Sequence, residues 1–324
     1  MAQFMLQQTM DRREGLLTYD KNILSIGSCF ADQIGTRLAE DGFSTTCNPF
    51  GVIYNPLAMV QTLLPIPHQL LANHTVSRDG LFMNLMAHSN LFGQSESDLL
   101  LALEATEKTV ALKLAEADII ILTLGTAWAF TYLPTGKIVS NNHKLPATQF
   151  SRRLLAVDEI ATSLQLFMSH LAVVGKACCQ VIVTVSPVIH GRDRLDENML
   201  SKSTLRLATA QFVSHFPEKA IYFPAYEILR DELRDYRFFA DDMQHPSKQA
   251  TDIIYQRFLD TYTSAATLHT RSSIGSISKA LAHRPMHEPE DAKKKRLLKI
   301  GTEIDSLPTI VSQAVRQRLT DLGQ

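Results

Sequence analysis

The sequence has few of the features that mark secreted, membrane-spanning or nucleic-acid-binding proteins. It holds only four cysteines in 324 residues, and their spacing fits neither a disulfide framework nor a zinc site. No apolar run is long enough to cross a bilayer, and residues 1–13 lack the apolar segment of a secretion signal. The formal net charge is -1. We therefore expect a cytoplasmic protein without nucleic-acid or membrane partners.

Short apolar runs alternate with longer amphipathic stretches between residues 20 and 260. We expect helices over residues 31–40, 56–64, 97–116, 157–174, 198–212 and 246–258. The expected strands are Ile23–Ile26, Phe43–Cys47, Ile119–Leu124, Val181–Val185 and Ile221–Phe223. This alternation predicts a flavodoxin-like three-layer α/β sandwich with a parallel sheet of about five strands. Ligands of such folds bind at the carboxyl ends of the strands.

The composition changes after about Thr263. Ser, Thr, Ala and His are frequent up to residue 287 and show little periodicity. We expect a helix over Glu290–Leu307 and, after Pro308, a short last helix over Ile310–Leu319. The predicted division is an α/β domain of residues 1–262 and a C-terminal helical extension of residues 263–324. The extension would form a homo-oligomer or cap the cleft, and the sequence does not choose between them.

A candidate nucleophile follows the first expected strand. Gly27 permits a tight turn, and Ser28 stands where the strand gives way to a helix. The free N–H groups of a helix N-terminus beside Ser28 could hold an oxyanion. Taken alone, however, a serine before a helix is more often an ordinary N-cap. Cys29 is a rival nucleophile, because thiolates need less activation. Consecutive residues entering a helix point about 100° apart, so Ser28 and Cys29 cannot both face one base.

A candidate base and its partner precede the last expected helix of the α/β domain. Asp242 and His245 are three residues apart, and Pro246 follows at once. A serine hydroxyl needs a base to remove its proton, and an imidazole needs a partner that fixes its tautomer. A lone pair with this spacing is more often a surface loop with a capping aspartate. Both segments, however, should lie at the carboxyl edge of the same sheet, which favours a Ser28–His245–Asp242 triad.

This layout resembles the SGNH/GDSL hydrolases, and several motifs resemble their GSCFA branch. These are Gly27-Ser28-Cys29-Phe30-Ala31, Asn48-Pro49-Phe50-Gly51 with Tyr54-Asn55-Pro56, Leu124-Gly125-Thr126-Ala127-Trp128, Ser186-Pro187-Val188, and Asp242-Met243-Gln244-His245-Pro246. The resemblance implies the SGNH hydrolase sandwich. It also implies an oxyanion hole formed by the backbone N–H groups of Ser28 and Gly51. Ala127 stands where the superfamily has an asparagine, so Asn142 is a candidate replacement donor, although a turn-forming role fits Asn142 equally well.

The same resemblance implies a serine-dependent esterase that acts on a small acyl ester, on a carbohydrate by preference, without cofactor or metal. The partner would be a small-molecule or glycan ester. The alternatives are an acyl transferase in glycan biosynthesis and a non-catalytic carbohydrate-binding protein. Cys29 and Trp128 are each expected to pack in the interior rather than to react or to stack on a sugar. The candidate substrate-binding residues are Gly125, Thr126, Trp128, His143, His190, Asn198 and Lys202.

Overall fold

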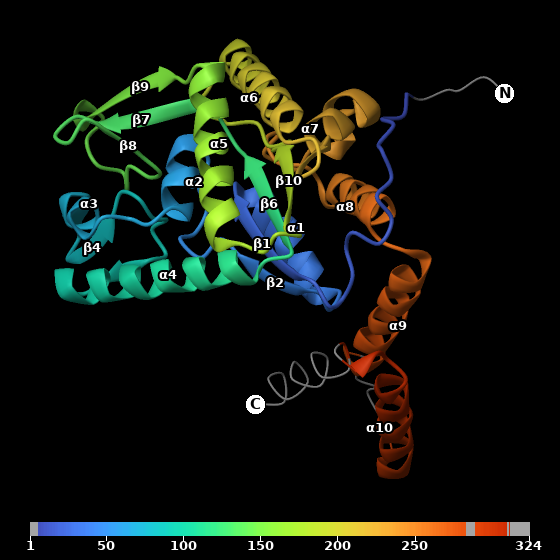
Figure 1. Cartoon of the computed structure of the whole chain (residues 1–324). Coiled ribbons are helices and arrows are strands. Elements are labelled where there is room, and N and C mark those ends of the chain that lie inside the picture. Colours follow the sequence, from blue (N-terminus) through green and yellow to red (C-terminus); the bar gives the residue numbers. More distant parts are fainter. Residues whose placement is uncertain (1–5, 283–288, 310, 312–324) are drawn as a thin grey trace.

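The computed structural model describes residues 6–282, 289–309 and 311. Its centre is a five-stranded parallel sheet in the order β11-β10-β6-β1-β2 (Figure 1). The strands are β1 (Asn22–Gly27), β2 (Ser44–Cys47), β6 (Ile119–Leu124), β10 (Gln180–Val185) and β11 (Ala220–Phe223). The register pairs Gly27 with Thr123, and Val185 with Leu124. The ends of β1, β6 and β10 therefore share one edge, and the predicted parallel sheet is confirmed.

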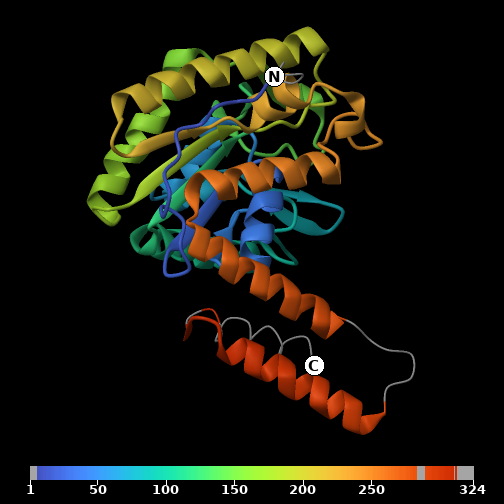
Figure 2. The same cartoon turned by 90° about the vertical axis from the view of Figure 1, so that its right-hand side faces the viewer.

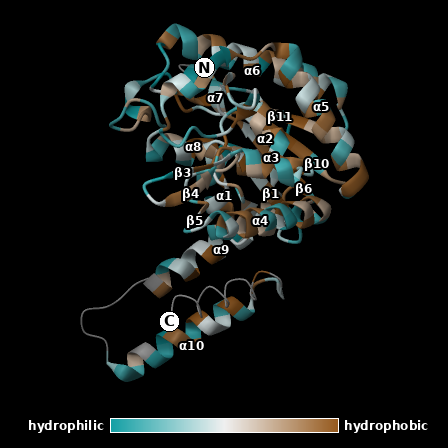
Figure 3. Cartoon of the chain, turned by 90° about the vertical axis from the view of Figure 1, so that its left-hand side faces the viewer, coloured by the Kyte–Doolittle hydropathy of each residue, from teal (hydrophilic) through white to brown (hydrophobic). Residues whose placement is uncertain are grey.

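Helices cover both faces of this sheet. One face carries α2 (Pro56–Leu63), α4 (Glu96–Glu116), α5 (Val157–Val174) and α6 (Leu195–His215), and the other carries α1 (Cys29–Glu40) and α8 (Lys248–Tyr262). Side chains of a strand alternate between the faces. Ile120 and Leu122 accordingly join the first hydrophobic core, and Ile119 and Ile121 join the second. The central strands are largely brown, or hydrophobic, in Figure 3 because both of their faces are buried.

Two small antiparallel sheets, which the sequence did not predict, are inserted between the parallel strands. Their strands are β3 (Thr75–Arg78), β4 (Leu81–Asn84) and β5 (Phe92–Gly93), then β7 (Trp128–Tyr132), β8 (Lys137–Val139) and β9 (Phe150–Leu154). The short helix α3 (His68–Asn73) precedes the first of them, and α7 (Ala225–Glu227) follows β11 and runs into a π-helical turn, Ile228–Leu233. Because β7 begins shortly after β6 ends, the second small sheet borders the carboxyl edge of the central sheet.

The helices α9 (Ala265–Ala282) and α10 (Glu290–Asp305) pair with one another beyond the α/β body (Figures 1 and 2). The prediction of α10 is confirmed to within two residues. The helix α9 differs from the prediction, since residues up to 287 showed little periodicity. Ile274 and Ile277 are nevertheless buried in the core that α1 and α8 share, and this packing stabilises the helix. Most of the short helix predicted over Ile310–Leu319 lies outside the described residues.

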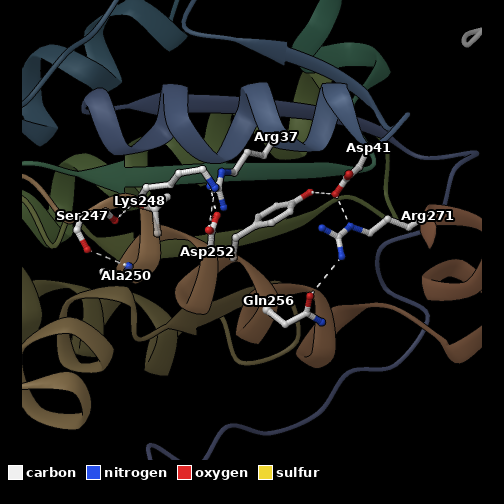
Figure 4. Close-up of polar contacts among 10 residues, drawn as sticks. Arg37, Asp41, Ser247, Lys248, Ala250, Asp252, Gln256 and Arg271 are labelled. Carbon is white, nitrogen blue, oxygen red and sulfur yellow. Dashed lines mark hydrogen bonds and ion pairs between the residues drawn. The ribbon is translucent and has the colours of Figure 1, made fainter. Parts of the chain in front are cut away.

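A polar network attaches α9 to the body (Figure 4). Asp41, just after α1, accepts hydrogen bonds from the Tyr255 hydroxyl at 2.7 Å and from Arg271 of α9 at 2.5 Å. On the neighbouring turns, Arg37 of α1 pairs with Asp252 of α8. These contacts join residues on both sides of Thr263, where the composition changes.

Candidate active site

The turn after β1 requires glycine at position 27. Gly27 has φ +141°, and a Cβ atom there would lie 2.1 Å from the Thr123 carbonyl oxygen. The Asn48 side chain supports the same turn. Its Oδ1 accepts the Gly27 N–H at 2.7 Å, and its Nδ2 donates to Asp32 at 2.6 Å. The turn that carries Ser28 and Cys29 is therefore held from two sides.

Ser28 is the N-cap of α1 and is almost fully buried, with 1% of its surface exposed. Its Oγ accepts the Phe30 N–H at 3.3 Å. The expected contact between the Ser28 hydroxyl and His245 does not form. The Oγ atom caps the first turn of α1, and Ser28 is not among the residues that line the neighbouring cavity.

Cys29 occupies the position that was expected for Ser28. As the first residue of α1, it directs its Sγ to within 3.7 Å of His245 Nε2. His245 Nδ1 donates to Asp242 Oδ2 at 2.6 Å, so the Nε2 atom of the neutral ring is free to accept a proton. Asp242 Oδ1 accepts the N–H groups of Gln244 and His245 at 2.9 and 3.0 Å. The structure thus aligns a thiol, an imidazole and a carboxylate.

The charges around this group set the resting state of the thiol. Burial raises the pKa of Cys29, and the Asp32 carboxylate raises it further. The N–H groups at the start of α1 and the charge of Lys202 lower that pKa in part. The backbone N–H groups of His245 and Gln244 lower the pKa of Asp242 to about 2. At neutral pH the sulfur therefore keeps its proton, and the base beside it is what can activate it.

Two of the three expected oxyanion donors are already engaged. The Ser28 N–H donates to the Thr123 carbonyl at 3.1 Å, and the Gly51 N–H donates to the Asn48 carbonyl at 2.7 Å. These hydrogen bonds close the turns after β1 and β2, so neither N–H group points to the cavity as the sequence had suggested. Asn142 does line the cavity, and its Oδ1 accepts the Lys144 N–H at 3.3 Å.

A cavity of about 450 Å³ opens beside Cys29 and His245. It brings together three of the predicted substrate-binding residues, Thr126, Trp128 and His190. Burial lowers the pKa of His190 to about 4, and the neighbouring Lys202, His245 and Arg152 lower it too, so the His190 ring is neutral at pH 7. The remaining polar lining includes Tyr54, Asn55, Ser140, Asn141, Arg152, Arg192, Asp193 and Gln244.

The sequence of this site fits one known family. The GSCFA family model matches residues 22–258, which is most of the chain. The chain belongs to the GSCFA family. No curated protein matches it. The matched region of this GSCFA chain contains every residue of the cavity described above and ends within α8.

Four predicted substrate-binding residues of the GSCFA chain lie outside the cavity lining. Gly125 allows the Tyr54 backbone to approach, because a Cβ atom there would lie 2.9 Å from the Tyr54 carbonyl oxygen. His143 is buried, and its Nε2 lies 2.7 Å from the Asn84 carbonyl oxygen. Asn198 Oδ1 accepts the His190 N–H at 3.5 Å. Lys202 has 1% of its surface exposed and does not line this cavity. These four residues therefore belong to the surroundings of the cavity and not to its lining.

Trp128 lines the cavity, but its ring is already covered. The Arg152 guanidinium lies 3.9 Å from the ring centroid, and the indole N–H donates to the Glu197 carbonyl at 3.2 Å. Arg152 also pairs with Asp193. Arg152 lies on β9, whose polar sequence has no strand pattern that would mark this residue as part of a site. Gln244 could have been noticed, since it lies between Asp242 and His245.

The GSCFA chain shows no resident metal site in its described part, where no three His, Cys, Asp or Glu side chains gather to hold an ion. Among the described helices, none is long and apolar enough to span a membrane.

Proposed function

We propose that the chain is a cysteine-dependent acyl-ester hydrolase or acyl transferase in which Cys29, His245 and Asp242 carry the reaction. The single observation that supports this most is the 3.7 Å contact between Cys29 Sγ and His245 Nε2, on a ring that Asp242 orients. A thiol whose pKa is raised by burial needs such a base. Ser28 Oγ, by contrast, accepts the Phe30 N–H at the start of α1, and Ser28 is not among the residues that line the cavity.

The reaction would run in two stages. His245 Nε2 takes the proton of Cys29 as Sγ attacks the ester carbonyl, and the same proton then passes to the leaving alcohol. The remaining acyl group is bound to the sulfur as a thioester. Water, or an acceptor hydroxyl, gives its proton to His245 as its oxygen attacks the thioester carbonyl; the bond to sulfur breaks, and the Cys29 thiolate takes the proton back from His245. Asp242 stabilises the imidazolium in both stages. The Asn142 amide and the Cys29 N–H are the proposed donors to the oxyanion.

The test is the hydrolysis of p-nitrophenyl acetate together with peptide mass spectrometry of the trapped acyl group. The acyl group should reside on Cys29 and be released by hydroxylamine. Cys29→Ala should abolish turnover, and His245→Ala should lower it by about 100- to 10,000-fold, the usual contribution of a general base. Both effects follow from the Cys29–His245 contact.

Two variants serve as controls. Ser28→Ala should keep Cys29 reactive and lower stability by ~1 kcal/mol through the lost cap. Cys178→Ala removes an exposed thiol and should change neither acylation nor stability. An acyl group found on Ser28, or labelling by a fluorophosphonate at Ser28 that depends on His245, would overturn the assignment of Cys29.

The hydrolase and the transferase differ only in the acceptor. Adding alcohols of increasing size to the same assay separates them, because a transferase forms the new ester faster than free acid. A chain that never acylates, although its folding is intact, would instead be a binding protein with this fold.

A further inference from the structure

Lys202 is a buried cation that the reaction outlined above does not use. It lies on α6, with 1% of its surface exposed, and is among the largest fully buried side chains of the chain. Its Nζ donates to the Gly125 carbonyl at 2.7 Å and to the Ser186 carbonyl at 2.8 Å. These residues directly follow β6 and β10, so the ammonium group lies at the edge of the sheet that carries the candidate site.

A neutral side chain would fill this position at lower cost. Taking an ammonium group out of water costs several kcal/mol, and a buried cation usually has a carboxylate partner. Within the described part of the chain, the hydrogen bonds of Lys202 go to carbonyl groups and not to a carboxylate. Burial lowers its pKa to about 7, against the opposing effects of Cys29 and Asp193. A lysine in this position, charged below pH 7 in spite of that cost, points to an electrostatic role.

The carbonyl groups that hold Lys202 adjoin those that hold the nucleophile turn. The Ser28 N–H donates to Thr123, and the Gly125 carbonyl that receives Lys202 lies two residues further along. The electrostatic coupling is mutual: Lys202 lowers the pKa of Cys29, and Cys29 raises that of Lys202. The other charged or titratable groups that act on or contact Cys29 are Asp32 of α1, Tyr54 after β2 and His245 before α8.

We propose that Lys202 is an electrostatic positioning residue whose buried positive charge stabilises the anionic form of Cys29 while its two hydrogen bonds hold the loops after β6 and β10. The inference rests on the proposed function of Cys29. The positive charge of Lys202 comes from α6, on one face of the central sheet. The Asp32 carboxylate comes from α1, on the other face. Lys202 has 1% of its surface exposed and is not among the residues that line the cavity, so the proposed role is electrostatic and needs no contact with substrate.

The neighbouring residue provides a matched control. Ser201 is buried to the same extent, and its Oγ accepts the Ala127 N–H at 2.8 Å and lies 3.0 Å from Thr126 Oγ1. It therefore ties α6 to the same loop as Lys202 does, but without a charge. Ser201→Ala therefore measures how loosening this loop changes the alkylation rate of Cys29. Lys202→Met loosens the same loop and also removes the charge, so the difference between the two variants measures the effect of the charge.

The experiment follows the rate at which iodoacetamide alkylates Cys29 between pH 5.5 and 9, read by peptide mass spectrometry. Alkylation measures the thiolate fraction. At pH 6, where Lys202 is protonated, Lys202→Met should react ~10-fold more slowly than wild type, which corresponds to one pKa unit. Above about pH 8 the two profiles should converge, because the wild-type lysine has lost its charge. Ser201→Ala should follow wild type, and Lys202→Arg should keep the fast reaction at every pH.

The same series in a His245→Ala background separates the two proposals. In this background ester turnover should be lost. If Lys202→Met still slows the alkylation of Cys29 at pH 6, the inference about Lys202 holds independently of the proposed base. A folded Lys202→Met that matches wild type at pH 6, or that differs by the same factor at every pH, overturns the inference. If circular dichroism shows that Lys202→Met does not fold, Lys202→Gln keeps a donor for both carbonyls and takes its place in the test.

Discussion

Replacing Asn48 by alanine should weaken the turn that presents Cys29. The Asn48 side chain accepts the Gly27 N–H and is itself only 8% exposed. Its backbone has φ +40°, a left-handed conformation that asparagine tolerates better than alanine. Asn48→Ala removes the acceptor of the Gly27 N–H and places alanine in a backbone conformation that it tolerates less well. Because the site is buried, water has little access to replace the missing acceptor.

The size of the effect follows from these two losses. A buried N–H group left without an acceptor costs about 1–3 kcal/mol. A non-glycine, non-asparagine residue in the left-handed region costs about 1 kcal/mol more. Asn48→Ala should therefore lower the free energy of unfolding by ~3 kcal/mol, and it should also change the rate at which Cys29 is alkylated, since Asn48 holds the turn before it.

Urea denaturation followed by circular dichroism measures the loss. Asp79→Ala is the control: Asp79 has φ +53° in an exposed turn, so it bears the backbone penalty of about 1 kcal/mol without a buried hydrogen bond. The reasoning is refuted if Asn48→Ala costs no more than Asp79→Ala, because the Gly27 hydrogen bond would then contribute nothing.

Three further outcomes are expected. His190 has a pKa lowered to about 4 in the fold and an ordinary pKa near 6.5 when unfolded, so the unfolded chain binds its proton first as pH falls. Stability should therefore drop by up to about 2 kcal/mol between pH 7 and 5, and His190→Gln should reduce that drop in urea titrations. Gly27→Ala should cost more than ~3 kcal/mol, or prevent folding, because its Cβ would overlap the Thr123 carbonyl; thermal melts test this, and a variant as stable as wild type contradicts it. Arg152→Ala should uncover the ring of Trp128, the only tryptophan, and acrylamide should then quench its fluorescence more strongly; unchanged quenching would mean that Arg152 does not shield the ring.

The middle of the central sheet was predictable because β6 and β10 are nearly continuous apolar runs, whereas the edge strand β2 reads Ser-Thr-Thr-Cys. Ile119–Leu124 is buried on both faces, and burial of that kind leaves a clear signature in sequence. The small antiparallel sheets left none: β9 reads Phe-Ser-Arg-Arg-Leu, and its polar residues face solvent. The helix α9 depends on tertiary contacts of a few isoleucines, which local periodicity does not reveal.

The location of the candidate site was predictable from the sequence, but the residue that faces His245 was not. The rule that ligands bind at the carboxyl ends of parallel strands locates the turn after β1 and the loop before α8 together. Helix geometry also shows that only one of Ser28 and Cys29 can face His245. Which one does so depends on whether α1 starts at residue 28 or 29, and boundaries are the least reliable part of sequence-based assignment.

The burial that keeps Cys29 protonated should also slow the oxidation of its sulfur by peroxide. Peroxide attacks the thiolate, so a thiol whose pKa is raised by burial is oxidised slowly between turnovers. Cys178, by contrast, is exposed, so peroxide can reach its sulfur directly. A chain of this kind would accumulate sulfenic acid at its surface cysteine before it lost the sulfur that carries its chemistry.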